Sequence, residues 1–114
     1  MLTIDAMKEY GANIAEGMGR CLNREDFYLR LVRKAADDKG FETLKEAIDA
    51  HDLDRAFDIA HALKGVTANL ALTPLYEPIA EMVEFLRRRE DIDYSKWLMQ
   101  IANRIAALRA LCAE

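Results

Sequence analysis

Residues 53–71, LDRAFDIAHALKGVTANLA, decide the fold of this chain. Apolar and small side chains recur there at alternating spacings of three and four, at Leu53, Ala56, Ala60, Leu63, Thr67 and Leu70. That period places one face of a helix against a core, as in a helical bundle. Asp52 precedes the stretch and is a residue type that caps helix N-termini. The stretch therefore predicts a helix that begins after Asp52 and ends near Ala71.

Two more helices are predicted downstream. Thr73-Pro74 is typical of a helix start, with a capping residue followed by proline at the first helical position. Pro78 lacks a backbone donor, so we expect the first turn to be distorted. After a turn at residues 91–93, a last helix carries an apolar stripe at Trp97, Ile101, Ile105, Leu108 and Cys112.

Upstream, residues 24–50 carry a helical stripe that begins beside Asn23, the expected N-cap. Leu22 and Phe27 have the spacing of a hydrophobic staple. Gly40 interrupts the stripe with little change of phase, so we expect one unbroken helix from Arg24 to about Ala50. The alternative is two helices hinged at residues 38–40.

The first twenty residues are weakly helical, because three glycines lower their helix propensity. We expect one or two short helices there that cap a bundle. The chain is thus predicted to be all-α, an antiparallel up-down-up-down four-helix bundle with a short N-terminal capping segment. It should form a single domain over residues 1–114, with the cap in 1–22 and the bundle in 23–113.

Composition excludes several classes of function. A net charge of −4 over 114 residues argues against nucleic-acid binding as the main task. No apolar run approaches the roughly 20 residues that span a bilayer, and the start lacks the pattern of a signal peptide. Cys21 and Cys112 form no C-x-x-C pair and indicate two reduced thiols, so we expect a cytoplasmic protein. The initial Met and the complete bundle favour a free-standing chain, expected to be a monomer.

His61 is the residue of the decisive stretch that can carry chemistry. At about 100° per residue, it lies roughly 140° from the centre of the core face, so its imidazole should project into solvent. Lys64 and Gly65 lie one turn further on the same face. A neutral imidazole is a nucleophile near pH 7, and the Lys64 ammonium is placed to neutralise a phosphoryl group bonded to it. Gly65 leaves space for a partner protein, although glycine inside a helix costs roughly 1 kcal/mol relative to alanine.

The run from Ala60 to Leu70, AHALKGVTANL, resembles the signature A-H-x-L-K-G-x-x-x-x-L of histidine-containing phosphotransfer (HPt) domains. Leu75 also falls where that family usually has an apolar residue. The resemblance implies that His61 is phosphorylated, that Lys64 stabilises the phosphorylated form, and that Gly65 admits the partner. It also favours an unbroken helix through Gly40.

The same resemblance implies that the partners are response-regulator receiver domains and a hybrid sensor histidine kinase. The chain would carry no cofactor or metal of its own, would bind neither nucleic acid nor membrane, and would rely on Mg²⁺ held by the receiver. It would be a phosphotransfer intermediate, not an enzyme. Ala71, where the family often has Gly, and Val83, near a position that is often acidic, depart from the family pattern. We expect them to alter packing without loss of function.

A surface around His61 is the expected docking site for these partners. We assign to it Asp54, Phe57, Asp58, Ala68 and Leu72. Two other functions stay open. One is an HPt-like adaptor that binds a receiver or kinase without phosphotransfer, and the other is a small hydrolase with His61 as general base, loosely oriented by Asp58.

Two other features have simple structural explanations. His51 lies at a helix boundary and is expected to have no function. The run Arg87-Arg88-Arg89 is either a patch for an acidic partner or a set of cations that complements a helix C-terminus, and the second explanation is favoured.

Overall fold

The computed structural model describes residues 1–113, so Glu114, the last residue of the predicted domain, lies outside the described residues. Every regular element in the described part is a helix, which confirms the all-α class. In chain order the helices are α1 (Ile4–Tyr10), α2 (Ile14–Arg20), α3 (Glu25–Ala36), α4 (Gly40–Asp49), α5 (Leu53–Asn69), α6 (Thr73–Arg87) and α7 (Ser95–Ala113).

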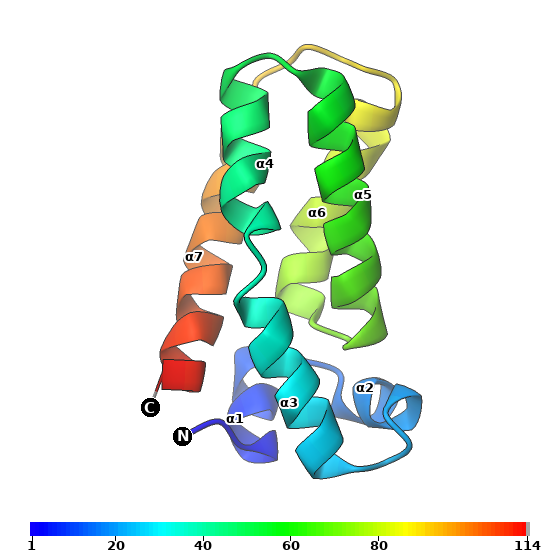
Figure 1. The fold of residues 1–114 in the computed structure, drawn as a ribbon, viewed down its shortest axis with the longest axis vertical. Helices are drawn as coiled ribbons and strands as arrows, with labels where there is room; N and C mark the ends of the chain where they lie inside the picture. Colours follow the sequence, from blue (N-terminus) through cyan, green and yellow to red (C-terminus); the bar gives the residue numbers. More distant parts are fainter. Residues whose placement is uncertain (114) are drawn as a thin grey trace.

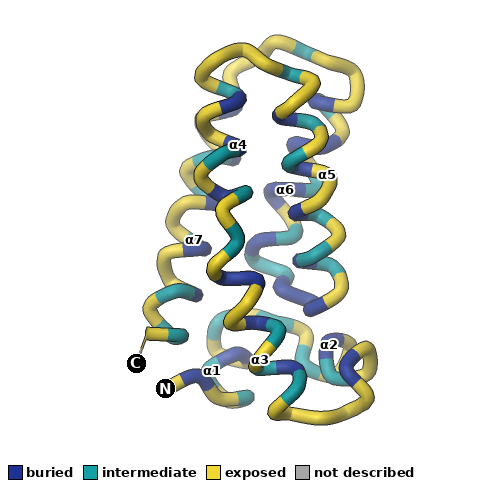
Figure 2. Tube along the Cα trace, viewed as in Figure 1, coloured by how far each residue is buried: buried dark blue, intermediate teal, exposed yellow. Residues whose placement is uncertain are grey.

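The long axis of the molecule is set by α4, α5, α6 and α7, which are connected at alternating ends (Figure 1). Helix α5 packs against α4 and α6, and α7 packs against α6, α4 and α3. Figure 2 shows that buried and exposed positions alternate along these helices, as their apolar periods require. The buried set includes the predicted stripe residues Ala56, Ala60, Leu63 and Leu108. Among residues 1–113, no helix is both long enough and apolar enough to cross a bilayer.

The predicted unbroken helix through Gly40 is wrong, and the hinged alternative is right. Helix α3 ends at Ala36 and α4 begins at Gly40. The Asp38 carboxylate accepts a hydrogen bond from the Gly40 backbone N–H at 2.7 Å, which competes with the helical hydrogen-bond ladder. Arg109 of α7 donates to the carbonyl of Ala36 at 2.8 Å and to that of Asp38 at 3.3 Å. Asp38 and Arg109 therefore provide hydrogen-bond partners for backbone groups that lose their helical partners at the break.

The predicted start of α3 is also corrected. The N-cap is Arg24, without a side-chain capping bond, because Leu22 and Asn23 adopt left-handed conformations with φ of 59° and 55°. Leu22 is 76% exposed, so it does not form the expected staple with Phe27.

Helix α5 begins as predicted, since the Asp52 carboxylate accepts a hydrogen bond from the Arg55 N–H at 3.2 Å. It ends at Asn69, and Ala71 turns the chain with φ of 53°. The N-cap of α6 is Leu72 instead of Thr73.

Pro78 lies inside α6 without ending it. Because proline has no N–H, the Pro74 carbonyl lacks its helical donor. Arg104 of α7 donates to that carbonyl at 2.7 Å and replaces the missing bond.

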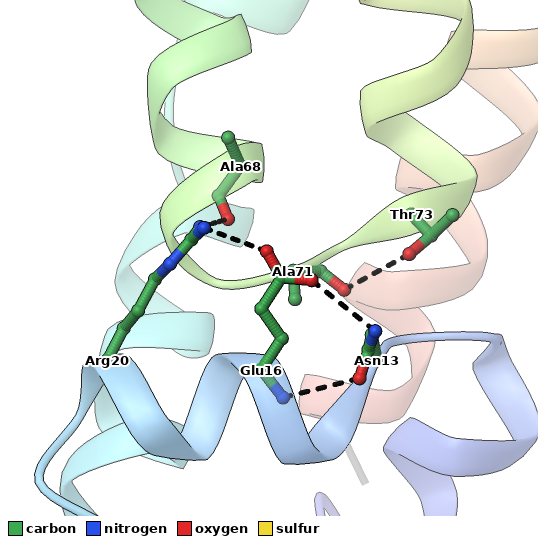
Figure 3. Close-up of polar contacts among 6 residues, drawn as sticks. All are labelled: Asn13, Glu16, Arg20, Ala68, Ala71 and Thr73. Carbon is green, nitrogen blue, oxygen red and sulfur yellow. Dashed lines mark hydrogen bonds and ion pairs between the residues drawn. The ribbon is translucent and has the colours of Figure 1, made fainter.

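The N-terminal segment lies against the turn between α5 and α6 (Figure 3). The Asn13 N–H donates to the Ala71 carbonyl at 3.0 Å, and the Arg20 guanidinium donates to the Ala68 carbonyl. The Tyr28 hydroxyl, which is buried, donates to the Leu70 carbonyl at 2.9 Å. Residues 13–28 thus supply hydrogen-bond donors to carbonyls at the C-terminal end of α5 and in the turn that follows it.

Candidate functional site

The exposed face of α5 carries the predicted reactive residue. Ala60 and Leu63 are at most 1% exposed and fix the rotation of the helix. His61 is exposed, as its phase on the helix predicts. Among residues 1–113, no group forms a hydrogen bond with either ring nitrogen of His61. The imidazole is therefore free to use a nitrogen lone pair on an incoming group.

Lys64 and Gly65 follow one helical turn after His61. Lys64 is half-buried, and its ammonium has no ion-pair partner within the described part of the chain. A Cβ built on Gly65 would meet no atom within 4 Å. The face thus combines a free imidazole, an uncompensated cation and open space, which together suit a transferred phosphoryl group and an approaching protein.

The comparisons with known proteins agree with this geometry. The family model described as "Hpt domain" matches residues 28–111, which is most of the chain. The chain belongs to the Hpt domain family. This confirms the resemblance carried by residues 60–70, and membership of this family implies a role in phosphorelay histidine phosphotransfer. Neither the curated proteins nor the solved structures yielded a match.

The match begins at Tyr28, so α1 and α2 lie outside the part that the Hpt model covers. The two departures from the family pattern, Val83 and Ala71, are both buried. They differ in backbone conformation, because Ala71 has the left-handed conformation in which glycine is favoured.

An aromatic ring contacts the imidazole of this Hpt domain. Phe57 and His61 are stacked with ring centroids 5.4 Å apart and ring planes inclined by 8°. Guanidinium groups of Arg87 and Arg89 lie over the Phe57 ring, at 5.3 and 4.7 Å from its centroid. The sequence pattern did not predict these two arginines as neighbours of the site. The run of three arginines was the available signal, but nothing in it distinguishes Arg89 from Arg88.

Arg89 also fulfils the favoured explanation of the arginine run. Its Nη1 donates to the Leu86 carbonyl at 2.8 Å, at the C-terminus of α6. Its Nε donates to the Asp54 carboxylate at 2.6 Å, which ties α5 to the end of α6. Asp54, predicted as a docking residue, is thus already paired, although it remains exposed.

Three other predicted docking residues lie in different surroundings. Asp58 is exposed, and it makes no hydrogen bond with His61 that would orient the ring for general-base chemistry. Ala68 is half-buried beside Arg20. Leu72 is fully buried, so its assignment to the docking surface is wrong. It would share the face of His61 only if α5 continued, but the left-handed Ala71 turns the chain inward first.

His51, the other histidine, has a structural partner. It follows the end of α4 with φ of 56°, and its Nδ1 lies 3.0 Å from the Asp91 carboxylate. This agrees with a boundary residue that fixes the turn before α7. Within residues 1–113, no three His, Cys, Asp or Glu side chains form a group that could hold a metal ion.

Proposed function

We propose that this Hpt domain is a phosphorelay carrier in which His61 accepts a phosphoryl group from a receiver-domain aspartate or a hybrid sensor kinase. His61 then passes the group to a response regulator. The observation that carries the proposal is the exposed imidazole, which lies one turn from the Lys64 ammonium and from a glycine with open space; among residues 1–113 the imidazole has no hydrogen bond and the ammonium no ion pair. Family membership supplies the class of reaction.

The transfer step needs only one nucleophile from this chain. A lone pair of one imidazole nitrogen forms the N–P bond, the P–O bond to the partner's aspartate breaks, and its electron pair leaves with the carboxylate. Lys64 neutralises charge on the phosphorylated ring. Because no general base or metal ligand set accompanies His61, we infer that the chain is not an enzyme and that the receiver supplies Mg²⁺.

We further infer a cytoplasmic monomer that binds receiver and kinase domains. The alternating connections of α4 to α7 support an up-down-up-down antiparallel bundle as its framework, with residues 1–22 as its cap. Such a framework is rigid enough to present one helix face to successive partners.

The test is transfer from a receiver domain phosphorylated in the presence of Mg²⁺. The protein should become labelled at one acid-labile position, and His61→Gln should abolish labelling while helicity and the melting temperature stay nearly unchanged. His51→Gln is the matched control, because it removes the other exposed imidazole, and it should be labelled normally. Retained labelling of His61→Gln would contradict the proposal. Receiver binding without exchange would instead support the HPt-like adaptor.

A further inference from the structure

The contact between Phe57 and His61 joins two side chains of α5 that are one turn apart. Parallel rings with centroids 5.4 Å apart form an offset stack, the arrangement that aromatic pairs prefer. It is the only ring contact of His61 among residues 1–113. Phe57 is half-buried, so its own ring is supported by neighbouring atoms on the protein side.

Arg89 holds the Phe57 ring from beyond the end of α6. Its left-handed backbone, with φ of 54°, turns the side chain back toward α5. The Asp54 carboxylate and the Leu86 carbonyl then fix the guanidinium by hydrogen bonds of 2.6 and 2.8 Å. The guanidinium carbon lies 4.7 Å from the Phe57 centroid, a cation–π distance. The Phe57 ring thus contacts the His61 imidazole and, together with the Arg87 guanidinium, the Arg89 guanidinium that is fixed between α5 and α6.

We propose that Phe57 is a positioning residue for phosphotransfer and that Arg89 acts through it. The inference rests on the proposed function, because it concerns the rate at which the His61 nitrogen reaches phosphorus. An exposed imidazole otherwise moves among staggered rotamers. The stack favours one of them and prepares the nitrogen for in-line attack. This role replaces the docking role predicted for Phe57 from the sequence: Phe57 contacts the nucleophile and leaves the partner's affinity unchanged.

The size of the effect follows from the strength of an aromatic pair. Such a pair contributes about 0.5–1.5 kcal/mol beyond its buried area, which corresponds to roughly a two- to tenfold rise in the ratio of the held rotamer to the other rotamers. Phe57→Leu keeps an apolar side chain but removes the flat ring. Because a side chain has about three staggered rotamers to choose from, the variant should slow transfer at saturating phosphorylated receiver by up to about threefold, with half-saturation unchanged. Phe57→Tyr keeps the ring and should restore the rate.

These variants separate positioning from docking and from stability. If Phe57 serves as a docking contact, Phe57→Leu raises the half-saturating receiver concentration and leaves the saturating rate unchanged, which would overturn the proposal. If Phe57 is only structural, the melting temperature falls and the saturating rate does not. Loss of labelling from the wild-type protein would instead overturn the proposed function itself.

Arg89 has a matched control in its neighbour. Arg88 carries the same charge, but it lies over Phe85 at 5.3 Å and pairs with Glu90 at 2.6 Å. Arg89→Gln should slow transfer measurably but by no more than Phe57→Leu, since Arg87 still lies over the ring, whereas Arg88→Gln should transfer at the wild-type rate. Equal slowing in both variants would assign the effect to net charge at the docking surface and overturn the role of Arg89.

A readout without phosphate tests the stack directly. Three-bond couplings that report the χ1 angle of His61 should indicate one dominant rotamer in the wild-type protein. They should become averaged in Phe57→Leu and in Arg89→Gln, but not in Arg88→Gln. An averaged His61 side chain in the wild-type protein would contradict the proposal even if labelling succeeds.

Discussion

Two helical glycines, Gly65 and Gly17, lie in opposite environments. A Cβ on Gly65 would meet nothing within 4 Å, whereas a Cβ on Gly17 would lie 2.6 Å from the Tyr28 ring and 2.9 Å from the Leu70 carbonyl. Neither residue has a positive φ, so neither is required by backbone conformation. Gly17 is required because α2 approaches the end of α5 closely. Among residues 1–113, no neighbour comes close enough to require glycine at position 65.

Gly17 therefore serves the packing of the fold, whereas Gly65 serves the surface beside His61. Glycine inside a helix costs roughly 1 kcal/mol relative to alanine. At Gly17 that cost is offset by the packing of α2 beneath the hydrogen-bonded carbonyls of α5. At Gly65 the structure offers no internal compensation, which supports a partner that needs the space beside His61.

The largest expected effect comes from filling that space. Gly65→Leu should lower the rate of phosphotransfer from a phosphorylated receiver by about a hundredfold, because the side chain displaces the incoming phosphorus from the imidazole. The rate is measured by labelling, and circular dichroism should show an intact fold. Gly19→Leu is the control, since Gly19 is also an exposed helical glycine with nothing within 4 Å. Normal labelling of Gly65→Leu would show that the open space has no role.

Gly17→Ala should act on stability instead. The added methyl group meets a backbone carbonyl, which cannot move aside like a flexible side chain, so the free energy of unfolding should fall by about 1–3 kcal/mol. Chemical denaturation measures this change. An unchanged denaturation midpoint would mean that α2 is not packed against Leu70 as described, while transfer to His61 should persist wherever the variant is folded.

Tyr28→Phe removes the donor to the buried Leu70 carbonyl, with an expected loss of about 1–2 kcal/mol. Burial raises the pKa of Tyr28 from its ordinary value of 10.0 to about 12. A raised folded-state pKa means that this group stabilises the fold fully below pH 10 and loses that contribution as the pH rises toward 12. The difference in unfolding free energy between the wild type and Tyr28→Phe should therefore shrink above pH 10. A constant difference would contradict the burial of the Tyr28 hydroxyl.

Helix phase and the start of α5 were predictable from the sequence, whereas the C-terminal turns of α4, α5 and α6 were not. The outward direction of His61, Lys64 and Gly65 depends only on 100° per residue and on the apolar period of α5. The ends of α4, α5 and α6 are formed by left-handed His51, Ala71 and Arg89, where a glycine would have been the sequence signal.

The incorrect predictions at the site arise because no glycine indicates where these helices end. Extending α5 past Asn69 placed Leu72 on the surface, although the chain had already turned inward. Arg89 reaches Phe57 because the turn after α6 reverses its side chain, and no spacing along the sequence encodes that reversal. The break before Gly40 was only the less favoured alternative for a related reason, since Arg109, which hydrogen-bonds the carbonyl of Ala36 at the break, comes from the far end of the chain.

The smallest expected effect is that of Gly65→Ala. Alanine gains helix propensity and meets no neighbour, so the free energy of unfolding should rise by up to about 1 kcal/mol. A single methyl group leaves most of the space beside His61, so labelling should slow far less than in Gly65→Leu.

Thermal denaturation and labelling of the same Gly65→Ala sample measure its stability and its rate of transfer. If Gly65→Ala stabilises the fold and also transfers phosphate at the wild-type rate, the space beside His61 tolerates a methyl group. Only side chains larger than alanine would then block the partner at position 65. If alanine destabilises the fold, a contact within the molecule requires Gly65, and the contrast with Gly17 fails.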